Sequence, residues 1–210
     1  MNEAQARERL VAAARRMREL GLNPARSGNA SLRFGAGFLV TPSGLAYERM
    51  RAEDVVQVDL ASGAAHGGKP SSEWRLHRDV YERRPEAGGI AHTHSPNATT
   101  LACLRRPIPP FHYEVAFAGG SDIRCADYAT FGTQALSDRA LAALEGRRAC
   151  LLANHGAVAL GATVEEAVEL AERVEALARL YRQSLQIGEP VLLDEVEMAR
   201  VVEKFRTYGK

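Results

Sequence analysis

Residues 90–95, which contain His92 and His94, constrain the fold more than any other part of the chain. Two glycines precede this segment and a proline follows it, an arrangement that predicts a short strand ending at a turn. Alternate side chains of a strand point to the same face, so we expect the two imidazoles to lie side by side. Such a pair can bind one divalent metal ion. The alternative is two half-buried or surface histidines.

Two other positions favour the metal interpretation. Glu73 lies upstream in residues 69–73, and His155 lies downstream, after an apolar run at 151–153. Three imidazoles and one carboxylate suit zinc, although manganese and cobalt accept the same ligands. All four residues stand at the edges of expected elements, where catalytic groups concentrate. The sequence therefore predicts one metal site with these ligands: Glu73, His92, His94 and His155.

The next signal is a set of small polar residues and glycine in turns, which favours an oxyanion such as phosphate. Some precede a helix expected at 73–84, where free backbone amides and the helix dipole attract anions, with a serine as the helix cap. Others lie in glycine-bearing turns. Taken singly, each can be an ordinary turn or capping residue, but Ser72 adjoins Glu73, which places phosphate beside metal. The candidate residues are Asn29, Ser43, Gly44, Ser71 and Ser72.

His77 lies one turn after Glu73 on the same expected helix. We interpret it as a solvated or core histidine, with a supporting role behind the metal ligands as the alternative.

Hydrophobic periodicity along the rest of the chain predicts one mixed α and β domain spanning 1–210. A helix at 163–185 opens with a capping-box pattern at Thr163 and Glu166 and carries an apolar face that includes Leu180. The other expected helices are 3–20, 98–104, 133–145 and a last one from 194. The expected strands are 31–34, 37–41, 55–60, 108–118, 122–126, 150–153 and 157–160.

Charge and composition exclude several classes of function. The 27 basic and 26 acidic residues are mixed along the chain, so nucleic acid and anionic membranes are poor candidate partners. No segment has the length and apolarity of a membrane span, and charged residues at the N-terminus argue against a signal peptide. Three scattered cysteines predict buried free thiols in a reducing cytoplasm: Cys103, Cys125 and Cys150.

Five motifs occur together and in order, and together they resemble the class II aldolase/adducin family. They are residues 28–31 (GNAS), 41–44 (TPSG), 69–73 (KPSSE), 92–94 (HTH) and 154–156 (NHG). The likeness runs over nearly the whole chain. Residues 71–75 and 128–133 favour the fuculose-phosphate aldolase branch. The resemblance implies a central, largely antiparallel sheet covered by helices on both faces, in a homotetramer whose active sites lie between subunits.

The same resemblance implies a reaction and residue roles. The expected reaction is reversible cleavage of a ketose 1-phosphate, such as L-fuculose 1-phosphate, to dihydroxyacetone phosphate and an aldehyde such as lactaldehyde. Zinc is held by the three histidines with Glu73 as fourth ligand, and Glu73, once displaced, moves a proton. Tyr113 is expected to act across a subunit interface. Tyr208, in a tail at 205–210 that would close over substrate, is expected to position the aldehyde end.

Asp122 and Arg124 depart from the aldolase pattern. Ribulose-phosphate 4-epimerases of the family carry an acidic residue near position 122, so a 4-epimerase is the nearest alternative. Other metal-dependent sugar-phosphate lyases follow. A non-catalytic adducin-type binding module is disfavoured because this chain keeps all four metal-ligand candidates.

Overall fold

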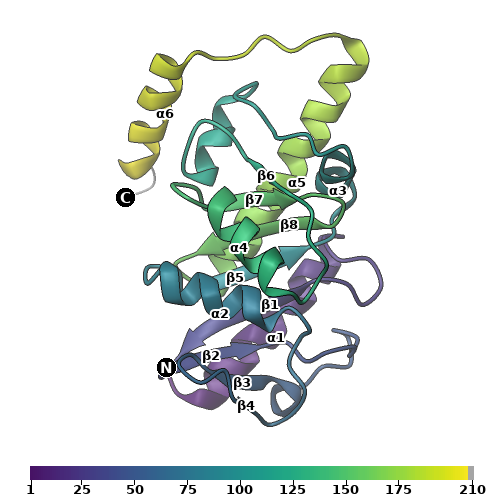
Figure 1. Cartoon of the computed structure of the whole chain (residues 1–210), viewed down its shortest axis with the longest axis vertical. Helices are drawn as coiled ribbons and strands as arrows, with labels where there is room; N and C mark the ends of the chain where they lie inside the picture. The colour runs from purple at the N-terminus through teal and green to yellow at the C-terminus, as the bar shows by residue number, and fades with distance from the viewer. Residues whose placement is uncertain (208–210) are drawn as a thin grey trace.

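The computed structural model describes residues 1–207, with side chains described as far as Phe205 (Figure 1). Its centre is an eight-stranded sheet in the order β4-β3-β2-β1-β5-β8-β7-β6, antiparallel except where β6 runs parallel to β7. The strands are β1 (Asn29–Phe34), β2 (Gly37–Val40), β3 (Val56–Asp59), β4 (Ala65–His66), β5 (Gly89–Thr93), β6 (Cys125–Ala126), β7 (Ala149–Leu152) and β8 (Gly156–Gly161). The predicted, largely antiparallel sheet is confirmed.

Helices cover both faces of this sheet, as predicted. α1, α3 and α5 pack over one face, and α2 and α4 cover the other (Figure 1). The helices are α1 (Glu3–Glu19), α2 (Trp74–Arg83), α3 (Pro96–Cys103), α4 (Gln134–Ala143), α5 (Val164–Ile187) and α6 (Glu195–Thr207), with short 3-10 helices η1 (Ala52–Asp54) and η2 (Tyr113–Ala118). Strand side chains alternate between the two cores: Ala91 joins the first, whereas Ile90 joins the second.

Strands β1 and β5 place Asn29 and His92 on one face of the sheet. In the antiparallel register, Asn29 of β1 is opposite His92 of β5, and Ser31 is opposite Ile90. Directly opposed residues point to the same face, which here is the face that α2 covers. The hairpin of β1 and β2 turns at Gly35, which has a positive φ of 56° that suits glycine.

The predicted strand at 108–118 is wrong. Only a single bridge, between Ile108 and Ile123, pairs in this region, and the chain then forms η2. Pro109 and Pro110 have no backbone N–H to give to a neighbouring strand. The η2 helix is instead capped by His112, whose ring accepts a hydrogen bond from the Glu114 amide. The predicted strand at 122–126 shrinks to the two residues of β6.

Two smaller expectations about burial are also corrected. Leu180 is 45% exposed, and the buried position of the last turns of α5 is its neighbour Tyr181. A helix turns by about 100° per residue, so the inward stripe shifts around α5 by one position over several turns. All three cysteines are free, yet Cys150 alone is buried, Cys125 is half-buried and Cys103 is exposed.

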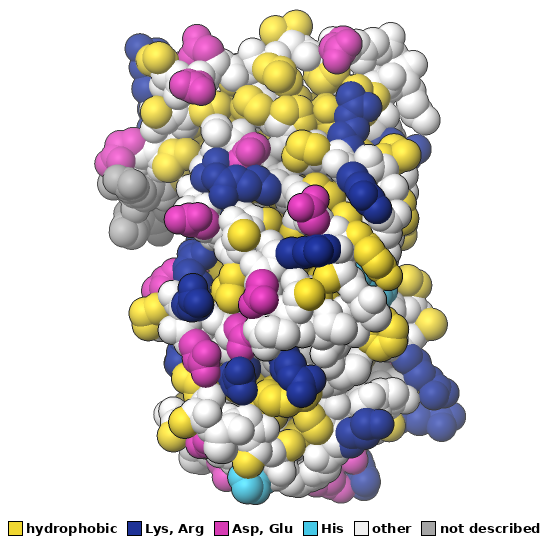
Figure 2. Space-filling view, in the orientation of Figure 1, with side chains coloured by type: hydrophobic (Ala, Val, Ile, Leu, Met, Phe, Trp, Pro, Cys, Tyr) yellow, Lys and Arg dark blue, Asp and Glu magenta, His cyan; other side chains and the backbone are white. Residues whose placement is uncertain are grey.

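The described surface mixes charges of both signs, and the face drawn in Figure 2 carries no block of one sign. This agrees with the nearly balanced sequence charge of +1. No helix in the described part of the chain has the length and apolar character to cross a membrane.

A carboxylate of α5 caps α3, directly after the paired histidines. Glu175 accepts hydrogen bonds from the backbone amides of Asn97 and Ala98 and from the Asn97 side chain, at 2.6–3.1 Å. These are the orphan donors of a helix N-terminus, satisfied here by a side chain distant in sequence. The contact ties the start of α3, and with it the end of β5, to α5.

We therefore expect Glu175→Ala to lower the free energy of unfolding by about 1–3 kcal/mol, since two amides lose their acceptor. Glu172→Ala, an exposed glutamate one turn earlier on α5, is the matched control and should change stability little. Urea unfolding followed by circular dichroism measures both. Equal stability of the two variants would contradict the capping role.

Candidate metal centre and substrate pocket

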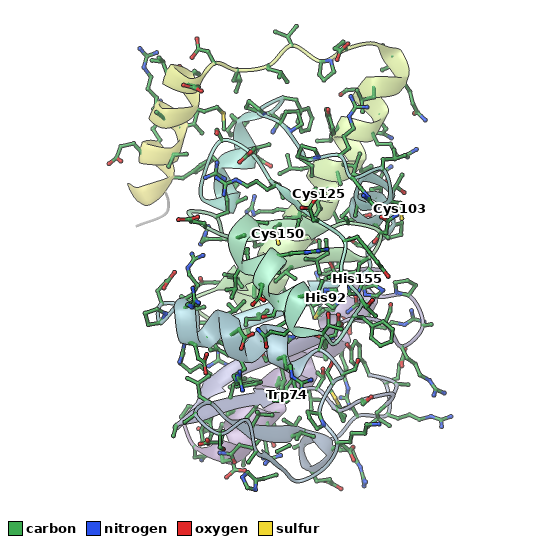
Figure 3. All side chains as sticks on the ribbon, in the orientation of Figure 1. Trp74, His92, Cys103, Cys125, Cys150 and His155 are labelled. Atoms are coloured by element: carbon green, nitrogen blue, oxygen red, sulfur yellow. The ribbon has the colours of Figure 1, made fainter. Side chains whose placement is uncertain are left out.

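Three histidine rings and one carboxylate converge at the carboxyl end of β5. His92 lies in the strand, His94 directly follows it, and His155 lies in the turn between β7 and β8. Each pair of ring centroids is 4.8 Å apart, and Figure 3 labels His92 and His155 close together. Glu73, at the N-cap of α2, completes a group whose ligand atoms all lie within 4.8 Å of one another. The predicted four residues are thus brought together.

A hydrogen bond from Nδ1 of His92 leaves the other ring nitrogen, Nε2, available for a metal. Its Nδ1 lies 3.0 Å from the carbonyl oxygen of Ala157, which can only accept, so Nδ1 carries the proton. In the neutral ring Nε2 then has a lone pair, and it faces Nε2 of His94 at 3.0 Å and Oε2 of Glu73 at 3.1 Å. Lone pairs crowded in this way fit a shared cation, and a carbonyl behind the ring is the usual support of a histidine ligand.

Burial and charge set the protonation of the cluster. Burial lowers the pKa of His94 to about 3 and that of His155 to about 4, helped in both by the nearby charge of His92. His92 is buried too, but the Glu73 carboxylate outweighs burial and raises the pKa of His92 over its ordinary value. Burial alone would raise the pKa of Glu73, whereas the charges of His92 and His155 hold it well below its usual range. Glu73 is therefore an anion, ready to balance a cation.

Local backbone geometry explains how His155 reaches the cluster. Asn154, just before it, has a positive φ of 55°, a conformation that asparagine tolerates better than most residues. Gly156, just after it, passes so close to β5 that an added Cβ would lie 2.2 Å from the carbonyl oxygen of Thr93. The asparagine and glycine that flank the histidine therefore make the tight turn possible.

A pocket of about 310 Å³ opens beside the cluster and is lined by Glu73, His94 and His155. Residues of two loops, which are joined by a bridge between Pro42 and Pro70, also line it. All five predicted anion-binding residues line it: Asn29, Ser43, Gly44, Ser71 and Ser72. The start of α2 faces the same space, and its dipole favours a negative charge there. Metal-type ligands and anion-type donors thus share one pocket.

The comparisons with known proteins agree with this geometry. The family model of the Class II Aldolase and Adducin N-terminal domain matches residues 8–182. The chain belongs to the class II aldolase and adducin family. A 5-methylthioribulose-1-phosphate/5-deoxyribulose-1-phosphate aldolase of Rhodospirillum rubrum is 54% identical over 203 residues, covering 97% of this chain and 92% of that protein. An L-fuculose phosphate aldolase of Escherichia coli O6:H1 is 46% identical over 194 residues, covering 92% and 90%.

The solved structures point the same way. An L-fuculose 1-phosphate aldolase superposes with a TM-score of 0.92 at 38% identity, covering 96% of each chain. A putative aldolase/epimerase/decarboxylase from Klebsiella pneumoniae gives a TM-score of 0.86 at 31% identity, covering 96% and 99%. The chain is a class II aldolase, a metal-dependent carbon–carbon lyase, and the Glu73 and histidine group can hold its metal.

The expected serine cap of α2 is corrected by the structure. The helix begins at Trp74, its N-cap is Glu73, and the cap side chain makes no capping hydrogen bond. The Glu73 carboxylate instead turns away from the helix toward His92 and the Asn29 amide. Ser71 supports the turn, where its hydroxyl accepts a hydrogen bond from the Glu73 amide at 3.3 Å.

Asn29 has contacts that the sequence did not reveal, and His77 occupies the supporting position that was given as its alternative. The Asn29 side chain lies at the pocket, but its amide nitrogen donates to Glu73 Oε2 and its oxygen contacts His77 Nε2. His77 is fully buried, so of the two expected settings, solvated or core, the core one is found, and burial lowers its pKa to about 3. Glu73, His77 and Tyr81 recur every four residues, and this helical spacing is the signal that links them.

Three pocket residues were missed altogether. Arg26 is the single arginine or lysine among the residues that line the pocket, and Tyr128 and Phe131 form its aromatic rim. Both rim side chains are exposed, at 46% and 64%. No short motif marks Arg26, whereas the aromatic residues lie in the segment 128–133 that carried part of the family resemblance.

Tyr113 and Asp122 lie outside this pocket. Tyr113 is in η2, 49% exposed, with its ring 6.2 Å from that of Phe205 on α6. Asp122 is held by Arg147 at 2.6 Å, beside a different cavity lined by prolines and the start of α6. Tyr208 and the end of the tail lie outside the described residues.

The cluster generates a metal-binding prediction. We expect about one divalent ion per chain by elemental analysis, and His92→Ala with His94→Ala should remove it. Affinity should weaken as the pH falls below neutral, because the raised pKa of His92 lets a proton compete for Nε2; it should recover as the pH rises. His66→Ala, at an exposed histidine on β4, is the control and should keep the ion. Full occupancy in the double variant would disprove the site.

Proposed function

We propose that this chain reversibly cleaves a ketose 1-phosphate between C3 and C4, giving dihydroxyacetone phosphate and an aldehyde. One observation carries the proposal: the metal-type cluster and the anion-type donors line the same pocket. A ketose 1-phosphate has its carbonyl one carbon from the phosphate, so it fits both halves of such a pocket. Zinc is the proposed ion, with Glu73, His92, His94 and His155 as its ligands.

The bound metal would polarise the ketose carbonyl and so stabilise negative charge that develops beside it during cleavage. Glu73 then has a defined task in the chain's own chemistry. As the C3–C4 bond breaks, its electrons remain with the dihydroxyacetone phosphate half, and Glu73 moves the proton that C3 gains. The proton of the C4 hydroxyl must leave as that carbon becomes an aldehyde. Tyr113 is proposed to exchange that proton.

The proposed phosphate site combines hydroxyls, amides and one cation. Ser43 and Gly44, in the turn after β2, and Ser71 and Ser72, just before α2, line the same pocket as the cluster. Arg26 reaches over the same loop and donates to the carbonyl oxygen of Gly44 at 3.3 Å. A phosphate dianion in this position would meet a helix N-terminus and a guanidinium together, which are both favourable to anions.

The aromatic rim supports a substrate whose far end is apolar. Cleavage of 5-deoxyribulose 1-phosphate releases acetaldehyde, and 5-methylthioribulose 1-phosphate releases an aldehyde with a methylthio group. Such ends suit contact with Phe131 and Tyr128, because thioether and methyl groups pack well on aromatic rings. We therefore place these two sugars beside L-fuculose 1-phosphate as candidate substrates, which agrees with the names of the relatives.

The remaining expectations concern assembly. Tyr113 is exposed on η2 and does not line the pocket of its own chain, which supports a role in a neighbouring chain, so we propose a homotetramer with sites between subunits. Tyr208 is proposed to close over the aldehyde end. The free cysteines support a reducing, cytoplasmic setting. Asp122 pairs with Arg147 outside the pocket of its own chain, and the 4-epimerase is kept as the alternative reaction.

The test is a rate comparison of the three ketose 1-phosphates, with dihydroxyacetone phosphate release measured by a coupled dehydrogenase assay on the metal-loaded protein. We expect release from at least one, abolished by a chelator and restored by zinc, and abolished in Glu73→Gln. Ribulose 5-phosphate is included in parallel. Its conversion to xylulose 5-phosphate, with no cleavage of any 1-phosphate, would replace the aldolase proposal with the epimerase.

The phosphate site predicts a separate effect of Arg26. Removing the guanidinium in Arg26→Ala should raise KM about tenfold and leave kcat nearly unchanged, because a phosphate remote from the breaking bond is bound equally before and during reaction. Arg49→Ala, an exposed arginine outside the pocket lining, is the control. A parent-like KM in Arg26→Ala would remove this residue from the phosphate site.

A further inference from the structure

A chain of buried hydrogen bonds runs from Glu73 into the core behind the metal cluster. The Asn29 amide nitrogen donates to Glu73 Oε2 at 2.9 Å, and the Asn29 oxygen contacts His77 Nε2. His77 Nδ1 lies 2.6 Å from the Ser31 hydroxyl, which lies 2.8 Å from the Tyr81 hydroxyl. None of these five residues is more than 5% exposed.

The ionised carboxylate fixes the direction of every bond in this chain. Glu73 can only accept, so the Asn29 NH₂ must face it and the Asn29 oxygen must face His77. His77 Nε2 must then carry the proton, and in the neutral ring Nδ1 must accept from the Ser31 hydroxyl. The Ser31 oxygen in turn accepts from Tyr81. Every donor therefore points toward Glu73, and successive bonds of this kind polarise one another.

Helix and strand periodicity place these side chains together. Glu73, His77 and Tyr81 are spaced by four along the inner side of α2, and Asn29 and Ser31 by two along β1 beneath it. The chain ends at Tyr81, which is 1% exposed, so it does not connect Glu73 with solvent. An asparagine amide also does not readily relay protons. The arrangement is therefore suited to holding a group in place rather than conducting protons.

The two oxygens of Glu73 differ sharply in their surroundings. Oε2 takes the Asn29 hydrogen bond, whereas Oε1 is buried and makes no hydrogen bond, with His155 Nε2 3.3 Å away. A buried acceptor without a donor is costly and therefore rare. One oxygen of Glu73 is thus anchored, and the other is left without a hydrogen bond and is available to a proton.

We propose that His77, Ser31 and Tyr81 are positioning residues that lock the Asn29 amide, so that Glu73 is anchored through Oε2 and moves protons through Oε1. Without the Nε2–H of His77, the Asn29 amide is free to turn over and present its oxygen to the carboxylate, which repels it. The inference rests on the proposed function in one respect only, the proton that Oε1 moves; the order of donors and acceptors does not depend on it.

The donor role of His77 can be removed or kept by substitution. His77→Met fills a similar volume without a donor, whereas the His77→Gln amide reaches Asn29 with an N–H. In the zinc-loaded enzyme we expect His77→Met to lower kcat about 10- to 100-fold with KM nearly unchanged, and His77→Gln to stay within about threefold of the parent. Solvent deuterium exchange into dihydroxyacetone phosphate, followed by NMR, should fall in parallel.

Loss of stability must be separated from loss of positioning. Ser137→Ala is the matched control. The buried Ser137 hydroxyl, on α4, donates at 2.6 Å to Asp79, which lies on α2 as His77 does, and neither residue belongs to the chain of five. This variant should lower the melting temperature and keep the parent kcat. Metal content is measured for every variant. A parent-like kcat in His77→Met, or a fall in kcat explained by lost metal, would overturn the proposal.

A spectroscopic measurement tests the same proposal without activity and without a variant. In parent protein labelled with ¹⁵N histidine, the His77 ring should be the neutral Nε2–H tautomer, and the Nδ1–H tautomer would reverse the chain and overturn the inference. Failure of the proposed function is distinguishable: the parent would then neither cleave a ketose 1-phosphate nor exchange protons of dihydroxyacetone phosphate, whatever the tautomer. If His77→Met does not fold, the tautomer measurement on the parent protein still decides the proposal.

Discussion

The ion pair between Glu73 and His92 is the interaction on which the site depends. Both side chains are buried, and their facing atoms lie 3.1 Å apart. Removing two charges from water costs several kcal/mol for each ion, and a buried pair seldom stabilises a fold more than apolar residues of the same size. The buried pair is therefore better explained by a role in the chemistry of the site than by a contribution to the stability of the fold. A metal cation that displaces the Nε2 proton of His92 would bind the ligand atoms that this pair holds together.

The central strands of the sheet provide this arrangement. β5 lies at the centre of the sheet between β1 and β8, and each neighbour brings part of the site with it. β1 places Asn29 opposite His92, and β8 follows the turn that carries His155. A displacement of either pairing by one residue would send side chains to the other face. The pairing of the central strands thus fixes the position of His92 and of the turn that carries His155.

Local patterns in the sequence were enough to predict part of this site. Alternation along residues 90–95 places His92 and His94 together, and this holds because strand geometry is local. The convergence of Glu73 and His155 with this pair was predicted from their residue types and their places at element edges, and the resemblance of motifs supported it, since no local rule joins residues so far apart. The helix at 73–84 was predicted to within a residue, but its serine cap was wrong because the Glu73 side chain binds histidines instead. The strand at 108–118 failed where prolines remove backbone donors.

The role of Asn29 shows why the remainder required a structure. Its amide was assigned to phosphate from its place in a glycine-bearing turn, whereas both of its polar atoms are engaged by residues of α2. That contact requires α2 to pack across β1 and β5, with Glu73 and His77 facing inward in step with Asn29 and Ser31. The sequence shows the helical spacing of Glu73 and His77 and the strand spacing of Asn29 and Ser31. It does not show that the two pairs lie against each other. One helix consequently serves three parts of the pocket: its start faces the anion donors, its N-cap residue joins the histidines, and its inner side holds that residue in place.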